Sequence, residues 1–75
     1  MGWEYVFVIF PRMRDVFIDG HRVGPTNQML YVPRGQHVFH LGVPVTYAPT
    51  TQVVNVVKTS AMRPKIIQFS ATSHT

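Results

Sequence analysis

The chain contains no cysteine, and this absence excludes several kinds of chemistry. Disulfide bridges, metal–thiolate clusters and thiol nucleophiles all require a cysteine sulfur. The chain is also short, at 75 residues, so it is expected to form one small domain. A domain of this size buries only about 60% of the surface of its unfolded chain, and its core has to form without a covalent bridge.

Acidic residues are scarce, with three Asp and Glu against seven Lys and Arg. A glycosidase needs two carboxylates that face each other across a cleft. Here Asp19 belongs to a predicted turn and Asp15 to the start of a predicted strand, and so small a domain has little room for a cleft. The glycines stand singly, without the spacing of a phosphate-binding loop. The sequence therefore predicts a noncatalytic protein.

The four histidines do not have the spacing of a metal site. His37 and His40 are three positions apart, so they would point to opposite faces of a strand. His21 follows a turn, and His74 lies in the C-terminal tail. Because zinc requires three or four converging ligands, we expect neither a metal nor another cofactor.

No apolar run is long enough to cross a membrane as a helix. The longest, residues 3–10, has about eight residues and includes Glu4, whereas a span needs roughly 20. It also lacks the basic start and the cleavage site of a secretory signal. The sequence therefore predicts no membrane span and assigns no compartment.

What the sequence does contain is a series of short runs rich in Val, Ile, Phe and Tyr, divided by six prolines and five glycines. These residue types favour strands, and no stretch has the apolar periodicity of an amphipathic helix. Short strands at this spacing indicate an all-β sandwich or barrel, and of the two we predict a single antiparallel β-sandwich of about six to seven short strands, Ig-like or prealbumin-like in form. The domain is expected at residues 1–70, with a frayed tail at 71–75. The strands are expected at residues 3–10, 16–18, 21–23, 28–32, 37–43, 52–58 and 65–70.

Glycines mark the predicted turns. Asp19-Gly20 between apolar runs indicates a hairpin with a type I′ turn, which needs positive φ at both central residues. Gly35 is expected at the left-handed position of a second tight turn. Gly24, followed by proline, is expected to bend a strand without reversing the chain.

Residues 3–10 are apolar on both faces, as in a central strand.

Four short motifs have a familiar order: Val16-Phe17-Ile18-Asp19-Gly20, Val23-Gly24-Pro25-Thr26, Pro33-Arg34-Gly35-Gln36-His37 and Tyr47-Ala48-Pro49. Over residues 6–69 the chain resembles the PEGA domain, a small β-sandwich module of bacterial and archaeal surface and envelope-associated proteins. That family shows V-x-V-D-G, G-x-T-P, P-x-G-x-H and G-Y-x-P elements. The chain departs from it in the order of Pro25 and Thr26, and in Thr46, where the family has glycine. The resemblance implies a noncatalytic envelope or cell-surface module that binds carbohydrate or protein.

The basic residues are the first candidate for a binding site. If the strands alternate in direction and Gly24-Pro25 only bends the chain, the connections at 11–15, 33–36 and 59–64 lie at one end. Such a basic pole would attract anions, although charges at the ends of sheets can also serve solubility alone. The pole would contain every basic residue except Arg22, namely Arg12, Arg14, Arg34, Lys58, Arg63 and Lys65.

Outward-facing aromatic residues are the second candidate. Alternation along the strands places Val16, Ile18, Leu30 and Val32 in the core, and turns the residues between them outward. The resulting patch could bind a sugar ring, a partner or a second copy, or could be covered by ordinary packing. Its members would be Phe17, Tyr31 and either Trp3 or Tyr5.

The sequence thus predicts an interaction module that binds a protein or an envelope polysaccharide, and that could also form a homo-oligomer. The alternative is a small basic nucleic-acid-binding domain, because the net charge is +4. Single-strand binders place basic and aromatic side chains on the same face. Here the aromatic residues are predicted along strands and the charges at one end, which favours the interaction module.

Overall fold

The computed structural model describes residues 2–72, and this part of the chain is all-β, with no helix. The strand positions largely follow the predicted runs, because each run of β-branched and aromatic residues ends at a proline, a glycine or a polar turn. The strands are β1 (Trp3–Ile9), β2 (Asp15–Ile18), β3 (His21–Pro25), β4 (Met29–Pro33), β5 (Gly35–His40), β6 (Tyr47–Ala48), β7 (Gln52–Val56), β8 (Lys65–Gln68) and β9 (Ser70–Ala71).

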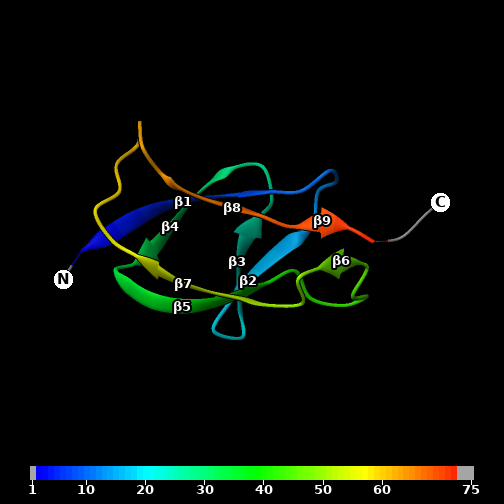
Figure 1. Ribbon diagram of the computed structural model, residues 1–75. Coiled ribbons are helices and arrows are strands. Elements are labelled where there is room, and N and C mark those ends of the chain that lie inside the picture. Colours follow the sequence, from blue (N-terminus) through cyan, green and yellow to red (C-terminus); the bar gives the residue numbers. More distant parts are fainter. Residues whose placement is uncertain (1, 73–75) are drawn as a thin grey trace.

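The strands form three sheets, with the orders β4-β1-β8, β3-β2-β5-β7 and β6-β9. In Figure 1 the three-stranded sheet lies above the four-stranded sheet, and the β6-β9 pair closes one end. The prediction of a purely antiparallel arrangement is wrong, because β1 and β8 are parallel. β7 ends near the end of the molecule where β1 starts, and the connection at 57–64 crosses there to the other sheet, so β8 runs beside β1 in the same direction (Figure 1).

One hydrophobic core draws side chains from all three sheets. The predicted inward residues Val16, Ile18, Leu30 and Val32 are all buried. In β1 the buried positions alternate with more exposed ones, and β1 is the central strand of its sheet, as its two apolar faces predict. The remaining core residues are Val6, Val8, Phe10, Phe39, Leu41, Tyr47, Val56, Ile67 and Phe69.

Alternation along the predicted strand at 37–43 places Phe39, Leu41 and Val43 on one face, but Phe39 and Leu41 are buried whereas Val43 has an exposed fraction of 87%. Gly42, between Leu41 and Val43, has a φ of 76°. This left-handed conformation ends the strand alternation that buries Phe39 and Leu41. The Asp19-Gly20 turn, by contrast, has positive φ at both residues, as predicted for type I′.

The corner that follows Gly24-Pro25 differs most from the prediction. The chain reverses there, since β3 ends at Pro25 in the four-stranded sheet and β4 returns antiparallel to β1 in the other sheet. Asn27, at a φ of 62°, accepts from the Phe10 N–H through Oδ1 and donates from Nδ2 to the Phe10 carbonyl. Buried Thr26 accepts from the Arg14 N–H through Oγ1 and donates to the Arg12 carbonyl.

The C-terminal segment is more ordered than predicted. Ala71 belongs to β9, which pairs with β6, and the Thr72 N–H donates to the Thr46 carbonyl at 3.0 Å. The rest of the predicted frayed tail, residues 73–75, lies outside the described residues. Across residues 2–72, no helix has the length and apolar character needed to span a membrane.

Candidate binding surface

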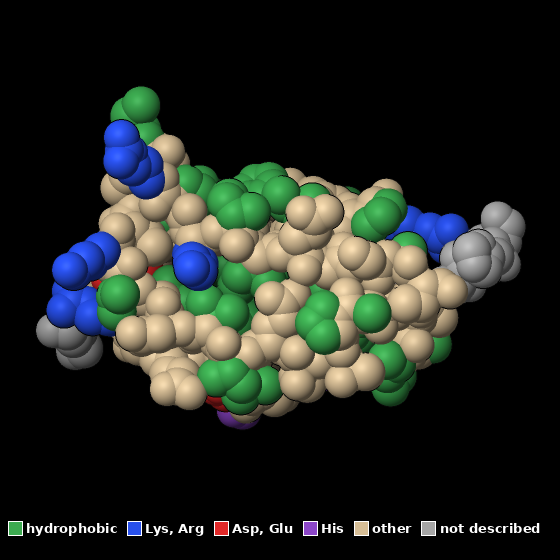
Figure 2. All heavy atoms as spheres, in the orientation of Figure 1, with side chains coloured by type: hydrophobic (Ala, Val, Ile, Leu, Met, Phe, Trp, Pro, Cys, Tyr) green, Lys and Arg blue, Asp and Glu red, His purple; other side chains and the backbone are tan. Residues whose placement is uncertain are grey.

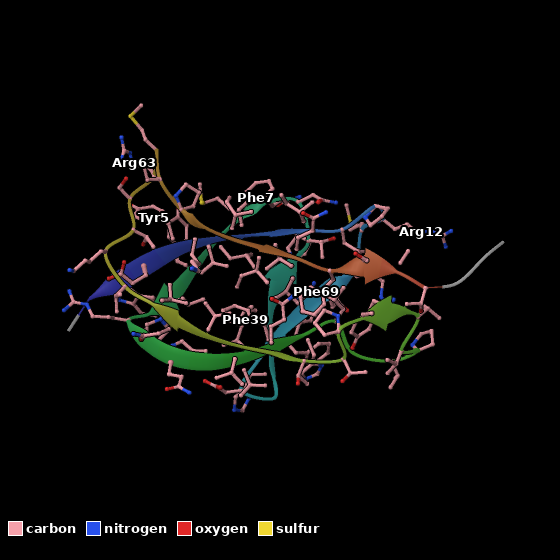
Figure 3. All side chains as sticks on the ribbon, viewed as in Figure 1. Tyr5, Phe7, Arg12, Phe39, Arg63 and Phe69 are labelled. Atoms are coloured by element: carbon pink, nitrogen blue, oxygen red, sulfur yellow. The ribbon has the colours of Figure 1, made fainter. Side chains whose placement is uncertain are left out.

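The predicted basic pole is wrong, because its members lie at two ends of the molecule. Arg12 and Arg63 are at opposite ends in Figure 3. Arg14 lies with Arg12 beside a cavity that Ala71 also lines, whereas Arg34 and Lys58 line a cavity next to Trp3. Lys65 begins β8 opposite Val6. The error arose at the corner after Gly24-Pro25, since one missed reversal exchanges the ends of all later connections.

Arg14 has a structural role that the sequence did not predict. Its guanidinium donates to the Thr46 hydroxyl and to the carbonyls of Leu41, Gly42 and Pro44, at distances of 2.8–3.3 Å. It also lies 5.2 Å from the centre of the Tyr47 ring. Four oxygen acceptors and the ring of Tyr47 hold this cation in place, so Arg14 fastens the 41–46 loop to the core.

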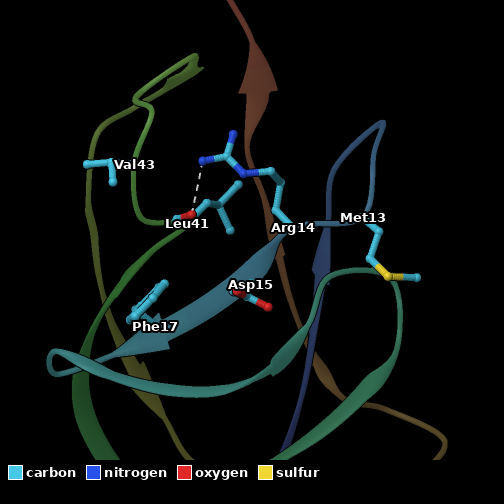
Figure 4. A pocket seen from close by; sticks show the side chains of 6 residues that line it. All are labelled: Met13, Arg14, Asp15, Phe17, Leu41 and Val43. Carbon is cyan, nitrogen blue, oxygen red and sulfur yellow. Dashed lines mark hydrogen bonds between the residues drawn. The ribbon is translucent and has the colours of Figure 1, made fainter.

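A cavity of about 390 Å³ beside Arg14 is shown in Figure 4. Its acid, Asp15, forms an ion pair with Arg22 at 2.8 Å, and its cation is Arg14, whose donors bind the loop. The charged groups of this cavity are therefore already partnered. The remaining lining residues are Met13, Phe17, Leu41 and Val43.

The predicted aromatic patch is split between the two larger sheets. Phe17 lies in β2 of the four-stranded sheet, where its ring stacks on His40 with centroids 5.0 Å apart and planes 4° apart. Trp3 and Tyr31 lie in the three-stranded sheet, with exposed fractions of 66% and 61%. Alternation correctly turned Tyr31 outward, but it could not show that β2 and β4 belong to different sheets.

The outer side of the three-stranded sheet forms what we call the aromatic face. Strand register places Tyr5 opposite Tyr31, and their rings meet edge to face with centroids 5.3 Å apart. Phe7 lies between Met29 on one neighbouring strand and Ile66 on the other. In Figure 3, Tyr5 and Phe7 point away from Phe39, which lies between the sheets. The aromatic face consists of Trp3, Tyr5, Phe7, Met29, Tyr31 and Ile66.

A cavity of about 560 Å³ lies at the end of this sheet, and we call it the end pocket. It is lined by Trp3, Glu4, Arg34, Val57, Lys58 and Thr59. Figure 2 shows Lys and Arg side chains gathered at the end of the molecule where β1 starts. A smaller cavity of about 330 Å³, which Trp3 and Arg34 also line, adjoins it.

Glu4 lies at the base of the end pocket, where its carboxylate binds two other lining residues, Thr59 and Arg34. Its Oε1 accepts from the Thr59 N–H at 2.9 Å and from the Thr59 hydroxyl at 2.5 Å, and its Oε2 accepts from Arg34 Nε at 3.2 Å. The Thr59 hydroxyl in turn accepts from the Tyr5 N–H. These bonds, first those from Thr59 and then that from Arg34, lower the pKa of Glu4.

Sequence reasoning missed the role of Glu4. The signal was present, because Glu4 has the same strand parity as the inward residues Val6 and Val8. A carboxylate at an inward position has to find hydrogen bonds and a cation. The sequence could not say which of the basic residues would supply the cation.

Two of the histidines, His37 and His40, have structural partners. His37 Nδ1 lies 2.5 Å from Asp19 Oδ2, and this contact raises the pKa of His37 and lowers that of Asp19. His40 stacks on Phe17 and accepts from the Gly42 N–H. Over residues 2–72, no group of three His, Cys, Asp or Glu side chains converges as metal ligands would.

Comparisons of the chain with protein-family models, with curated proteins and with solved structures gave no match.

Proposed function

We propose that the protein is a noncatalytic interaction module of PEGA type, and that its aromatic face binds a segment of another protein. The observation that carries the proposal is the exposure of Trp3, Tyr31 and Ile66 together on one side of a single sheet, at 66%, 61% and 51%. An apolar patch of contiguous aromatic side chains on a small protein is typical of an interaction site. Tyrosine and tryptophan are also frequent anchors of protein interfaces.

The fold that goes with this proposal is a β-sandwich of Ig-like or prealbumin-like form. Its support is the common core of the three-stranded and four-stranded sheets. The Tyr47 hydroxyl also accepts from the Leu41 N–H and donates to the Gly42 carbonyl, a few residues upstream. Such a tyrosine corner is a feature of many Ig-like sandwiches.

The chemistry of the aromatic face favours a protein segment over a polysaccharide. A sugar-binding site combines an aromatic ring with polar groups of the protein that bind the sugar hydroxyls. These polar groups occupy fixed positions around the aromatic ring. The only polar side-chain groups of the aromatic-face residues are the two tyrosine hydroxyls and the Trp3 indole N–H. A protein segment with apolar side chains matches such a surface more closely.

The distribution of charge favours a protein segment over a nucleic acid. A single strand needs cations along its whole path, beside the rings on which its bases stack. Arg34, Lys58 and Arg63 gather at one end, and none of the aromatic-face residues is basic. A partner that is apolar along the face and acidic at one end would match this arrangement, and its association would weaken with salt.

Selection from a displayed random-peptide library against the whole chain tests the proposal. We expect apolar peptides whose binding is weakened at least about fivefold by Tyr31→Ser and by Ile66→Ser, because interface anchors contribute at this level. The matched control is Val53→Ser, whose side chain is similarly exposed, at 59%, on the other large sheet. It should leave binding unchanged.

Titrations with single-stranded DNA and with a uronic-acid polysaccharide test the two alternative ligands. Micromolar binding of DNA with a steep dependence on salt, and no selected peptide, would replace the proposal with the nucleic-acid alternative. Binding of the polysaccharide that depends on Tyr31 would likewise replace the protein segment. Selected peptides that respond equally to Ile66→Ser and Val53→Ser would show that the aromatic face is not the site.

A further inference from the structure

The charges of the end pocket leave one positive charge for a ligand. Arg34 and Lys58 contribute two, and the Glu4 carboxylate at the base neutralises one. Glu4 is buried, with an exposed side-chain fraction of 6%, and it accepts three hydrogen bonds that favour its charged form. The pocket therefore complements an anion with a single charge better than a phosphate monoester, which carries nearly two.

The donors of the end pocket are available to a ligand. Arg34 uses Nε to bind Glu4, which holds its guanidinium in place, while its side chain stays 62% exposed. Within residues 2–72, Lys58 forms no salt bridge. Lys58 also has a φ of 57°, a left-handed conformation that is costly for a residue with a β-carbon. The bonds of neighbouring Thr59 to Glu4 hold the chain there.

The acceptors of the pocket, by contrast, are occupied. Both Glu4 oxygens bind donors of the protein, and the Thr59 hydroxyl donates to Glu4 and accepts from Tyr5. A ligand rich in hydroxyl groups would find few free acceptors here. An oxyanion needs donors alone, and the fork of a guanidinium suits a carboxylate.

Trp3 joins the end pocket to the aromatic face. Trp3 lines the pocket, and strand alternation places its side chain on the same side of β1 as Tyr5 and Phe7. A ligand seated between Arg34 and Lys58 would therefore meet an aromatic wall that continues toward Tyr31.

We propose that the end pocket binds one carboxylate of the partner segment, and that the apolar group next to this carboxylate packs on Trp3. The inference rests on the proposed function, and it adds to it a chemical requirement. The carboxylate could belong to an acidic side chain or to the C-terminus of the segment. Both present the same planar oxyanion to the two cations.

Titration of the full chain with phenylacetate, followed by NMR, tests the pocket without any partner. We expect saturable shifts at the Trp3 indole N–H and the Thr59 N–H, and none with neutral phenylacetamide. Lys58→Gly keeps the left-handed backbone allowed and removes one cation, and it should weaken binding about tenfold, as for a lost hydrogen bond to a charged group. Arg63→Gln makes the same change of charge in a residue that does not line the pocket, and should weaken it less than about threefold.

Equal losses for Lys58→Gly and Arg63→Gln would overturn the inference, since they would show attraction to net charge alone. Equal binding of phenylacetamide would do the same. Binding of dimethyl phosphate as strong as that of phenylacetate would assign the pocket to phosphodiesters. If phenylacetate fails while selected peptides still depend on Tyr31, the inference falls and the proposed function stands. Peptides with an amidated C-terminus separate a terminal carboxylate from an acidic side chain, since only the latter retains binding.

Discussion

The buried hydroxyl of Tyr47 is expected to fix the 41–47 loop, and Tyr47→Phe removes this group alone. The side chain is buried, with an exposed fraction of 3%, and its ring packs edge to face on Phe69. The hydroxyl accepts from the buried Leu41 N–H at 3.2 Å and donates to the Gly42 carbonyl at 2.9 Å. Phenylalanine keeps the ring and loses both hydrogen bonds.

The expected loss of stability depends on which hydrogen bonds remain to the two former partners of the hydroxyl. The Gly42 carbonyl keeps a bond from Arg14 at 3.3 Å, whereas the Leu41 N–H loses the side-chain oxygen that accepted from it. A buried donor without an acceptor costs about 1–3 kcal/mol, so we expect Tyr47→Phe to lower the free energy of unfolding by about 2 kcal/mol. For a domain of this size that corresponds to a fall in Tm of roughly 8–16 °C.

Urea unfolding followed by tryptophan fluorescence measures the effect, with Tyr31→Phe as the matched control. Tyr31 is 61% exposed, so loss of its hydroxyl should change stability by less than about 0.5 kcal/mol. The slope of the urea dependence should stay unchanged, because the surface exposed on unfolding is the same. Equal effects of the two substitutions would refute the assigned role of the Tyr47 hydroxyl.

Two further predictions concern pH and glycine. The pKa of Asp19 is lowered and that of His37 raised by their contact, so its stabilisation is lost as pH falls below 3.8 through the folded pKa of Asp19, and as pH rises above 6.5 through that of His37. Urea unfolding should thus show about 0.5 kcal/mol less stability near pH 8.5 than near pH 5.5, as for a partly exposed pair. Persistence of this difference in His37→Gln would contradict the assignment. Gly42→Ala should cost about 2 kcal/mol, because φ is 76° and the new Cβ would lie 2.7 Å from the Phe17 ring. Gly20→Ala, with a φ of 85° and no atom within 4 Å, should cost about 1 kcal/mol, and equal costs would show that the ring yields freely.

Local sequence signals predicted the strands and their inward faces well. Alternation buried Val16 and Ile18 correctly, and Asp19-Gly20 formed the predicted turn. These signals succeed because side-chain direction in a strand has a period of two, and because few residues adopt positive φ without strain. Where one residue broke the period, as at Gly42, the prediction for Val43 also failed.

The candidate site could not be predicted to the same degree, since it depends on which segments meet. Arg34 and Lys58 are distant in the sequence, and they come together because the chain reverses after Pro25 and because β7 ends near the start of β1. Phe17 and Tyr31 have the same local pattern, and only the assignment of β2 and β4 to separate sheets divides them.

The sequence by itself determined a small, cysteine-free, all-β domain, with a tight turn at Asp19-Gly20 and more apolar strand faces than one core can bury. These properties are set by neighbours along the chain, through propensity and alternation. The tertiary structure decided that the surplus apolar side chains form one aromatic face, and that Glu4 holds Arg34 beside it. That choice depends on long-range pairing, in which a single reversal at one corner moves every later charge to the other end of the molecule.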